Sequence, residues 1–130
     1  MKYNIDWLKE EVANNVQLSY VYFWGHISDK PDVGKECLSQ WYQCLFEELD
    51  IVYVTAEHYM MAKKALLFND KETYGKIINT LSPESAKSYG REIKNYDGLG
   101  KVGNVKCGDL MWIYIKVGKN KAGKEILKDV

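Results

Sequence analysis

A glutamate, a lysine and a single arginine are the residues of this chain best suited to chemistry. Glu57 and Lys64 lie seven positions apart in the segment from Thr55 to Phe68, and a helix of about 100° per residue puts both on one side. Charges on a mostly apolar helix are costly to bury unless they are paired or engaged with a ligand. At about 1.5 Å per residue the two start about 10 Å apart, so they could converge on one ligand from two ends. The alternative is that both reach water from the flanks of the helix.

The arginine stands out because the other basic residues are all lysines. Of the 18 basic residues, only Arg91 is an arginine. Its planar guanidinium can bind two phosphate oxygens at once. Arg91 follows Gly90, which we predict as the left-handed residue just beyond the end of a helix. A phosphate ligand is one interpretation of Arg91, and a cation that complements the helix C-terminus is the other.

Three consecutive helices are predicted to position these groups. The first covers residues 55–68, with Thr55 as N-cap. The second covers residues 71–80, and the third begins where a serine cap, a proline and a glutamate follow one another at 82–84. The first of these helices is apolar around most of its circumference, which predicts a central, buried helix.

The rest of the chain is predicted to hold short strands and connections. Runs rich in aromatic and β-branched residues predict strands at 17–24, 51–54 and 111–117. Residues 97–108 are rich in glycine but contain neither GxxxxGK[ST] nor GxGxxG, so we predict a flexible connection there. The two ends are predicted to hold a helix at 4–16, capped by Asn4, and a short helix within 118–129.

Composition narrows the class of protein. The 130 residues suffice for one domain, and 18 acidic residues balance the 18 basic ones. Zero net charge argues against a general nucleic-acid binder, and no apolar run reaches the roughly 18–20 residues that span a bilayer. The first residues lack the apolar stretch of a signal peptide, so we expect a cytoplasmic protein. Three widely spaced cysteines and two histidines predict free thiols, with no metal and no cofactor.

Several motifs in order resemble one known family. They are FWGH at 23–26, LSQWY at 38–42, YVTAEHYMMAKKALLFND at 53–70, SP at 82–83, AK at 86–87 and GR at 90–91. Together, over residues 20–97, they resemble the NADAR family, also called YbiA-like. The resemblance implies an α+β fold, helix-rich with a small β-sheet, in one domain over residues 1–130. Within it, residues 20–97 bear the motifs and residues 98–130 form a divergent tail.

The resemblance also implies an activity. Members are associated with NAD and ADP-ribose-type ligands, and characterised members cleave N-glycosidic bonds. Their substrates are ribosylaminopyrimidine phosphates or guanine bases of nucleic acid that carry ADP-ribose. The resemblance therefore implies an N-glycosidase, a hydrolase that cuts between a ribosyl carbon and a base nitrogen in such a nucleotide.

Roles for individual residues follow from the same resemblance. Glu57 and Lys64 match the motif positions expected to be catalytic, and Arg91 matches the expected phosphate contact. Trp24 and Trp41 are expected to stack on a flat base, and Gly25 to let the backbone approach the ligand. The positions assigned to substrate binding are Trp24, Gly25, His26, Ser39, Gln40, Trp41, Lys87, Gly90 and Arg91.

One departure from the family pattern supports an alternative. Members carry a W-G-x-G motif near their C-terminus that helps form the active site, and no such motif occurs up to Val130. Trp112 stands in a different context. The alternative is a non-catalytic protein that binds or sequesters an ADP-ribose- or NAD-derived nucleotide, and a third hypothesis is an NAD-consuming toxin. A fold that lacks part of its cover could also pair with a second copy of the chain.

Overall fold

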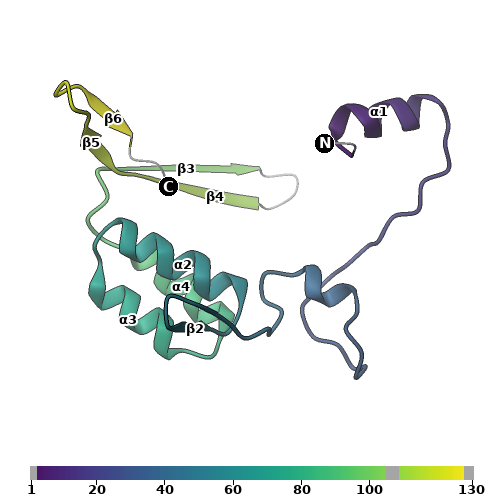
Figure 1. Ribbon diagram of the computed structural model, residues 1–130, viewed down its shortest axis with the longest axis horizontal. Helices are drawn as coiled ribbons and strands as arrows, with labels where there is room; N and C mark the ends of the chain where they lie inside the picture. Colours follow the sequence, from purple (N-terminus) through teal and green to yellow (C-terminus); the bar gives the residue numbers. More distant parts are fainter. Residues whose placement is uncertain (1–2, 105–108, 128–130) are drawn as a thin grey trace. The chain divides into compact units, whose positions relative to one another are not determined.

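A computed structural model describes residues 3–104 and 109–127 of the chain. The fold divides into two compact units, Met1–Ser39 and Gln40–Val130, and Figure 1 shows helices and two-stranded antiparallel sheets. The predicted α+β class is confirmed, while a single domain over residues 1–130 stays a prediction. Within the described ranges no helix combines the length and apolarity that crossing a bilayer requires.

Residues 3–39 of the N-terminal unit form one α-helix and one short 3₁₀ helix. Helix α1 covers Ile5–Ala13, and η1 covers Lys35–Leu38. As predicted, Asn4 caps α1, its side chain accepting a hydrogen bond from the Trp7 amide at 2.8 Å. The strand predicted at 17–24 is wrong. Within residues 3–39 no second strand pairs with this segment, and an unpaired strand leaves its backbone groups without partners.

The second unit opens with a β-hairpin. Strands β1, Phe46–Glu48, and β2, Ile51–Tyr53, pair antiparallel, which confirms the strand predicted at 51–54. The two turn residues, Leu49 and Asp50, have φ of +52° and +62°. Two positive φ angles in a two-residue loop match the right-handed twist of the flanking strands. The hairpin thereby delivers the chain directly to the cap of the next helix.

The three predicted helices are confirmed. Helices α2, α3 and α4 cover Ala56–Leu67, Lys71–Asn79 and Pro83–Glu92. Their N-caps accept hydrogen bonds from amides three residues on, and these caps are Thr55, Asp70 and Ser82. Each cap satisfies an amide that the helix itself leaves unpaired.

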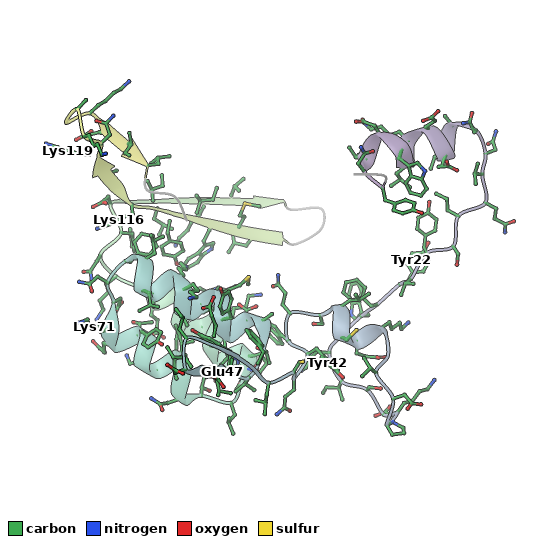
Figure 2. All side chains as sticks on the ribbon, viewed as in Figure 1. Tyr22, Tyr42, Glu47, Lys71, Lys116 and Lys119 are labelled. Carbon is green, nitrogen blue, oxygen red and sulfur yellow. The ribbon has the colours of Figure 1, made fainter. Side chains whose placement is uncertain are left out.

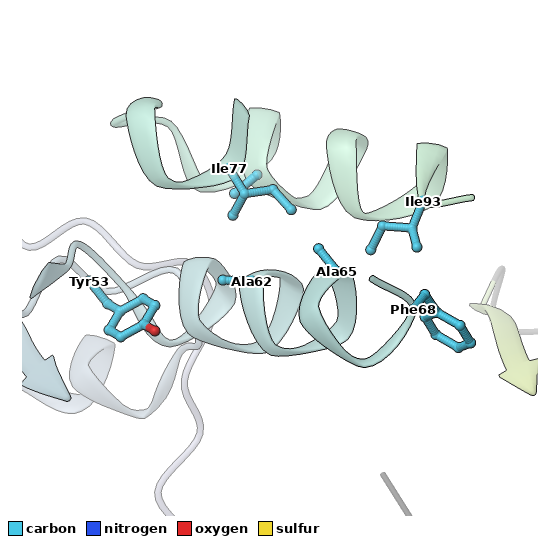
Figure 3. Close-up of a cluster of buried hydrophobic side chains, with 7 residues drawn as sticks. Tyr53, Ala62, Ala65, Phe68, Ile77 and Ile93 are labelled. Carbon is cyan, nitrogen blue, oxygen red and sulfur yellow. The ribbon is translucent and has the colours of Figure 1, made fainter. Parts of the chain in front are cut away.

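The core of this unit lies between the three helices (Figure 3). Ala62 and Ala65 of α2 are completely buried, and Phe68, just after α2, is 2% exposed. Small side chains at the first two positions let α3 and α4 approach α2 closely, and Ile77 and Ile93 fill the remaining space. Helix α2 is therefore central, as its apolar circumference predicts.

Two hairpins complete the described chain, and both correct predictions. Strands β3, Gly98–Asn104, and β4, Asp109–Ile115, pair antiparallel. Strands β5, Val117–Lys119, and β6, Glu125–Leu127, form the second hairpin. The flexible connection at 97–108 is wrong for the part now seen as β3, residues 105–108 lying outside the described ranges. The short helix predicted within 118–129 is also wrong for the described part up to residue 127, and residues 128–129 lie outside the described ranges.

A partner strand explains why a glycine-rich segment is ordered. Glycine weakens an isolated strand because it brings no side chain to pack. Here β4 supplies the missing side chains. Tyr114 of β4 packs with its ring centroid 6.1 Å from that of Phe68, so the β3–β4 ribbon is attached to the helical core.

Gly90 occupies a different position from the one predicted. Helix α4 continues to Glu92, so Gly90 lies inside it and is buried rather than ending it. A Cβ built at Gly90 would lie 3.3 Å from Met61 Cβ and would overlap the rest of that side chain. The missing side chain is therefore required for α4 to pack against α2.

Replacing Gly90 with alanine is expected to lower the free energy of unfolding by about 1–3 kcal/mol, because the added methyl group overpacks the contact with Met61. Gly75 of α3 is the matched control, since a Cβ there meets nothing within 4 Å. Gly75→Ala should stabilise the chain by about 0.4–1 kcal/mol through the unfolded state. Urea unfolding measures the free energy of unfolding of both variants. Changes of the same sign in the two variants would contradict the packing of Gly90 against Met61.

Candidate functional site

Glu57 lies in the first turn of α2 and is only 3% exposed. Its Oε2 accepts a hydrogen bond from Trp41 Nε1 at 3.1 Å, and its amide donates to the Gln40 carbonyl at 3.0 Å. The positive end of the helix dipole favours a carboxylate at this position. The segment before β1 thus holds both the backbone and the side chain of Glu57 in place.

A cavity of about 140 Å³ adjoins Glu57. Side chains from three elements line it. Residues three or four apart share one face of a helix, and residues two apart share one face of a strand. From α2 come Glu57, Met61 and Lys64, from α4 come Lys87 and Arg91, and from β4 come Leu110, Trp112 and Tyr114. Glu57 is buried, Lys64 is half-buried, and Lys87 and Arg91 are exposed. One buried carboxylate and three cations therefore share the cavity.

Lys64 is held at the cavity by two neighbouring elements. Its Nζ donates a hydrogen bond to the Gly90 carbonyl at 2.7 Å and lies 3.2 Å from the centroid of the Tyr114 ring. Burial, and then the positive charge of Arg91, lower the pKa of Lys64 from 10.5 to about 8. At neutral pH the ammonium group is still mostly protonated, but it gives up its proton more readily than an exposed lysine.

Raising the pH from about 8 to about 10.5 is expected to stabilise the folded chain through Lys64. The unfolded chain holds this proton up to about 10.5, whereas the folded chain releases it near 8. Because the unfolded state binds more protons in this window, the free energy of unfolding rises with pH. Lys64→Met should remove the rise, while the same change at the exposed Lys71 should leave it. Urea unfolding across this pH range tests it, and a rise that persists in Lys64→Met contradicts the assignment.

The buried His58 fixes the turn that carries Glu57. Its Nε2 lies 3.1 Å from the Thr80 carbonyl oxygen, and its Nδ1 lies 2.8 Å from Thr55 Oγ1. A carbonyl only accepts, so Nε2 carries the proton and Nδ1 accepts from the Thr55 hydroxyl. Burial lowers the pKa of His58, which favours this neutral form. The start of α2 is thereby tied to the segment between α3 and α4.

The described ranges hold two free thiols and no cluster of side chains suited to a metal ion. Between residues 3 and 104 and between 109 and 127, no three His, Cys, Asp or Glu side chains gather where a metal ion could bind. Cys37 and Cys44 are free thiols, as predicted, while Cys107 lies outside the described residues.

The structure brings together most of the predicted site residues of the second unit. Trp41 contacts the cavity residues in two ways, donating to Glu57 and lying with its ring centroid 5.5 Å from Lys87 Nζ. Gln40 contributes its backbone carbonyl. Around the cavity lie Trp41, Glu57, Lys64, Lys87, Gly90 and Arg91.

The other predicted site residues belong to the N-terminal unit. Trp24 is 98% exposed there, and Gly25 has a φ of +83°, a conformation that favours glycine. The members of this group are Trp24, Gly25, His26 and Ser39. Their roles in binding stay predictions, as do the catalytic and binding roles of the cavity residues.

Strand β4 closes the cavity with Trp112 and Tyr114, which are not among the predicted site residues. The Trp112 ring centroid lies 5.6 Å from the Arg91 guanidinium carbon, and the Tyr114 hydroxyl donates to the Arg91 carbonyl at 3.2 Å. Alternation along the strand predicted at 111–117 already puts Trp112 and Tyr114 on one face. What it could not indicate is that this face packs against α2 and α4.

Comparison with known proteins identifies a family and several relatives of this chain. N-glycosidase R617 of Acanthamoeba polyphaga mimivirus is 37% identical over 83 residues, which are 60% of this chain and 48% of that protein. The chain thus spans about half the length of that curated relative. A stretch of 30 residues is 60% identical to the iron-sulfur cluster assembly scaffold proteins IscU 1 and IscU 2 of Archaeoglobus fulgidus, covering 23% of this chain and 20% of each of those. The sequence model of the NADAR domain family matches residues 22–128, so the chain belongs to the NADAR family.

Proposed function

We propose that this chain is an N-glycosidase that hydrolyses the bond between a ribosyl carbon and a base nitrogen in a nucleotide. The observation that carries the proposal is the buried carboxylate of Glu57 beside Lys64 and Arg91 in one cavity. Family membership and the name of the mimivirus relative support the same reaction class. The proposed substrates are an ADP-ribose-type nucleotide, including one attached to guanine, or a ribosylaminopyrimidine phosphate.

The residue types suit the steps of this reaction. As the carbon–nitrogen bond breaks, positive charge develops on the ribosyl ring, as in other glycoside hydrolyses. Glu57 would stabilise that charge and accept a proton from the attacking water, whose oxygen forms the new bond to carbon. Lys64, with its pKa near 8, would supply a proton to the leaving nitrogen or hold the ribose. Arg91 would bind a phosphate through two hydrogen bonds.

The size of the cavity limits which part of the substrate enters. Pockets that enclose a whole drug-sized ligand measure about 300–1,000 Å³. The cavity here is about 140 Å³, so it would receive the ribosyl phosphate part. Trp41, Lys87 and the exposed rim would then contact the remainder of the nucleotide.

Binding without hydrolysis is the second candidate. Three cations surround the single carboxylate of the cavity, and this excess of positive charge favours a phosphate ligand whether or not a bond is cleaved.

A paired screen of turnover and thermal stability tests the proposal. The chain is incubated with NAD, an ADP-ribosylated guanosine and a ribosylaminopyrimidine phosphate, and release of the free base is followed by chromatography. Bound ligand raises stability by RT ln(1 + [L]/Kd), about 2.7 kcal/mol at a hundredfold excess over Kd. Release of base supports the enzyme, stabilisation alone supports the binding protein, and neither response to any ligand rejects both.

A further inference from the structure

Four cations at the cavity and its rim form no salt bridge within the described part of the chain. Among the described residues, Lys64, Lys87, Arg91 and Lys101 take part in no salt bridge. Lysines elsewhere do, in the pairs Lys63–Glu48, Lys76–Glu72, Lys94–Glu72 and Lys116–Asp97. Burial, and after it the positive charge of Arg91, lowers the pKa of Lys64. Because Glu57 is the one carboxylate among the described residues that line the cavity, this excess of positive charge favours a ligand with several negative charges.

Lys101 reaches this group through the pairing of the β3–β4 ribbon. Lys101 and Trp112 are direct cross-strand partners, so their side chains share one face. Lys101 Nζ lies 3.8 Å from the centroid of the Trp112 ring, against which the Arg91 guanidinium also lies, at 5.6 Å. The ribbon therefore adds a positive charge beside the cavity. This charge comes from a segment that follows the helical motifs in the sequence.

Trp112 offers an unused hydrogen-bond donor at the same place. Its Nε1 is buried and has no hydrogen-bond partner within the described part of the chain. An indole N–H only donates, and a buried donor without an acceptor is unfavourable. A phosphoryl oxygen on the ligand would satisfy it, next to the cations that neutralise the phosphate.

We propose that Lys101 and Trp112 bind a second phosphoryl group of the ligand, beside the one bound by Arg91. The site then prefers nucleotides with two linked phosphates over those with one. This inference rests on the proposed function, because it takes the cavity as the nucleotide site. It assigns specificity to the ribbon, outside the motifs of residues 20–97.

Calorimetric titration of the full chain with inorganic pyrophosphate and with inorganic phosphate tests the inference. The parent is expected to bind pyrophosphate about tenfold more tightly than phosphate. A difference of this size corresponds to one additional hydrogen bond to a charged group. Lys101→Met should lose that tenfold preference and keep its affinity for phosphate. Lys119→Met is the matched control, since Lys119 lies on β5 and is exposed (Figure 2), and it should behave as the parent.

A second variant separates the indole N–H from the ring. Trp112→Phe keeps an aromatic face for Lys101 and Arg91, and it should weaken pyrophosphate binding while thermal unfolding shows an intact fold. Equal affinity of the parent for the two anions, or no pyrophosphate binding, overturns the inference. So does an unchanged preference in Lys101→Met. Neither anion is hydrolysed, so this test is independent of turnover. A preference for pyrophosphate that depends on Lys101 supports the inference even if no turnover is found. Turnover without that preference rejects the inference and leaves the proposed function standing.

Discussion

Replacing Glu57 with glutamine is expected to reduce base release by about 100- to 10,000-fold, the range over which general acid–base groups contribute. Glutamine has almost the same shape and keeps a carbonyl oxygen for the hydrogen bond that Trp41 Nε1 makes at 3.1 Å. The change therefore removes the negative charge while retaining the contact. Ligand affinity, measured by calorimetry, should change far less than turnover.

The control for this variant is Glu47→Gln. Glu47 lies on β1, is exposed, and is not among the residues that line the cavity. It should keep parental turnover. Turnover of Glu57→Gln within about threefold of the parent, far below that catalytic range, would show that the carboxylate does not take part in the reaction.

Replacing Phe68 with alanine is expected to lower the free energy of unfolding by about 3–5 kcal/mol, the usual cost of deleting a buried phenyl ring. Phe68 is 2% exposed and belongs to the core between the helices. Natural domains are stable by only about 5–15 kcal/mol, so this change would remove a large part of the total. Urea unfolding at constant m-value measures it.

The loss should extend to the site, because Phe68 also supports the cavity wall. Its ring packs against Tyr114, which lines the cavity and lies against Lys64. Leu66→Ala is the control, since Leu66 is 47% exposed and alanine favours a helix. That variant should stay within about 0.5 kcal/mol of the parent. Equal losses in the two variants would mean that Phe68 is not part of the core.

The helices could be predicted because their signals are local. Thr55, Asp70 and Ser82 each cap a helix through an amide three residues away, so the neighbouring sequence contains the whole interaction. The same periodicity puts Glu57 and Lys64 on one side of α2, and the cavity indeed includes both. Helical spacing needs no information from distant residues.

Strands and helix ends were harder to predict than the helices, because they depend on partners that are distant in the sequence. Residues 17–24 have strand composition, but within residues 3–39 no strand lies beside them. Residues 98–104 have poor strand composition, yet β4 pairs with all of them. Gly90 carries the usual signal of a helix end, but α4 continues through it because the glycine faces Met61 of α2.

The sequence by itself determined the family motifs, the three capped helices and the shared face of Glu57 and Lys64. Only the tertiary structure decided which cations surround that face. Arg91 and Lys87 come to it because α4 packs on α2. Lys101 comes to it because β3 pairs with β4, whose Trp112 packs against Arg91 of α4. Caps and helical faces follow from contacts a few residues apart. A cavity that joins residues 57 and 112 depends on packing between elements, which no local pattern encodes.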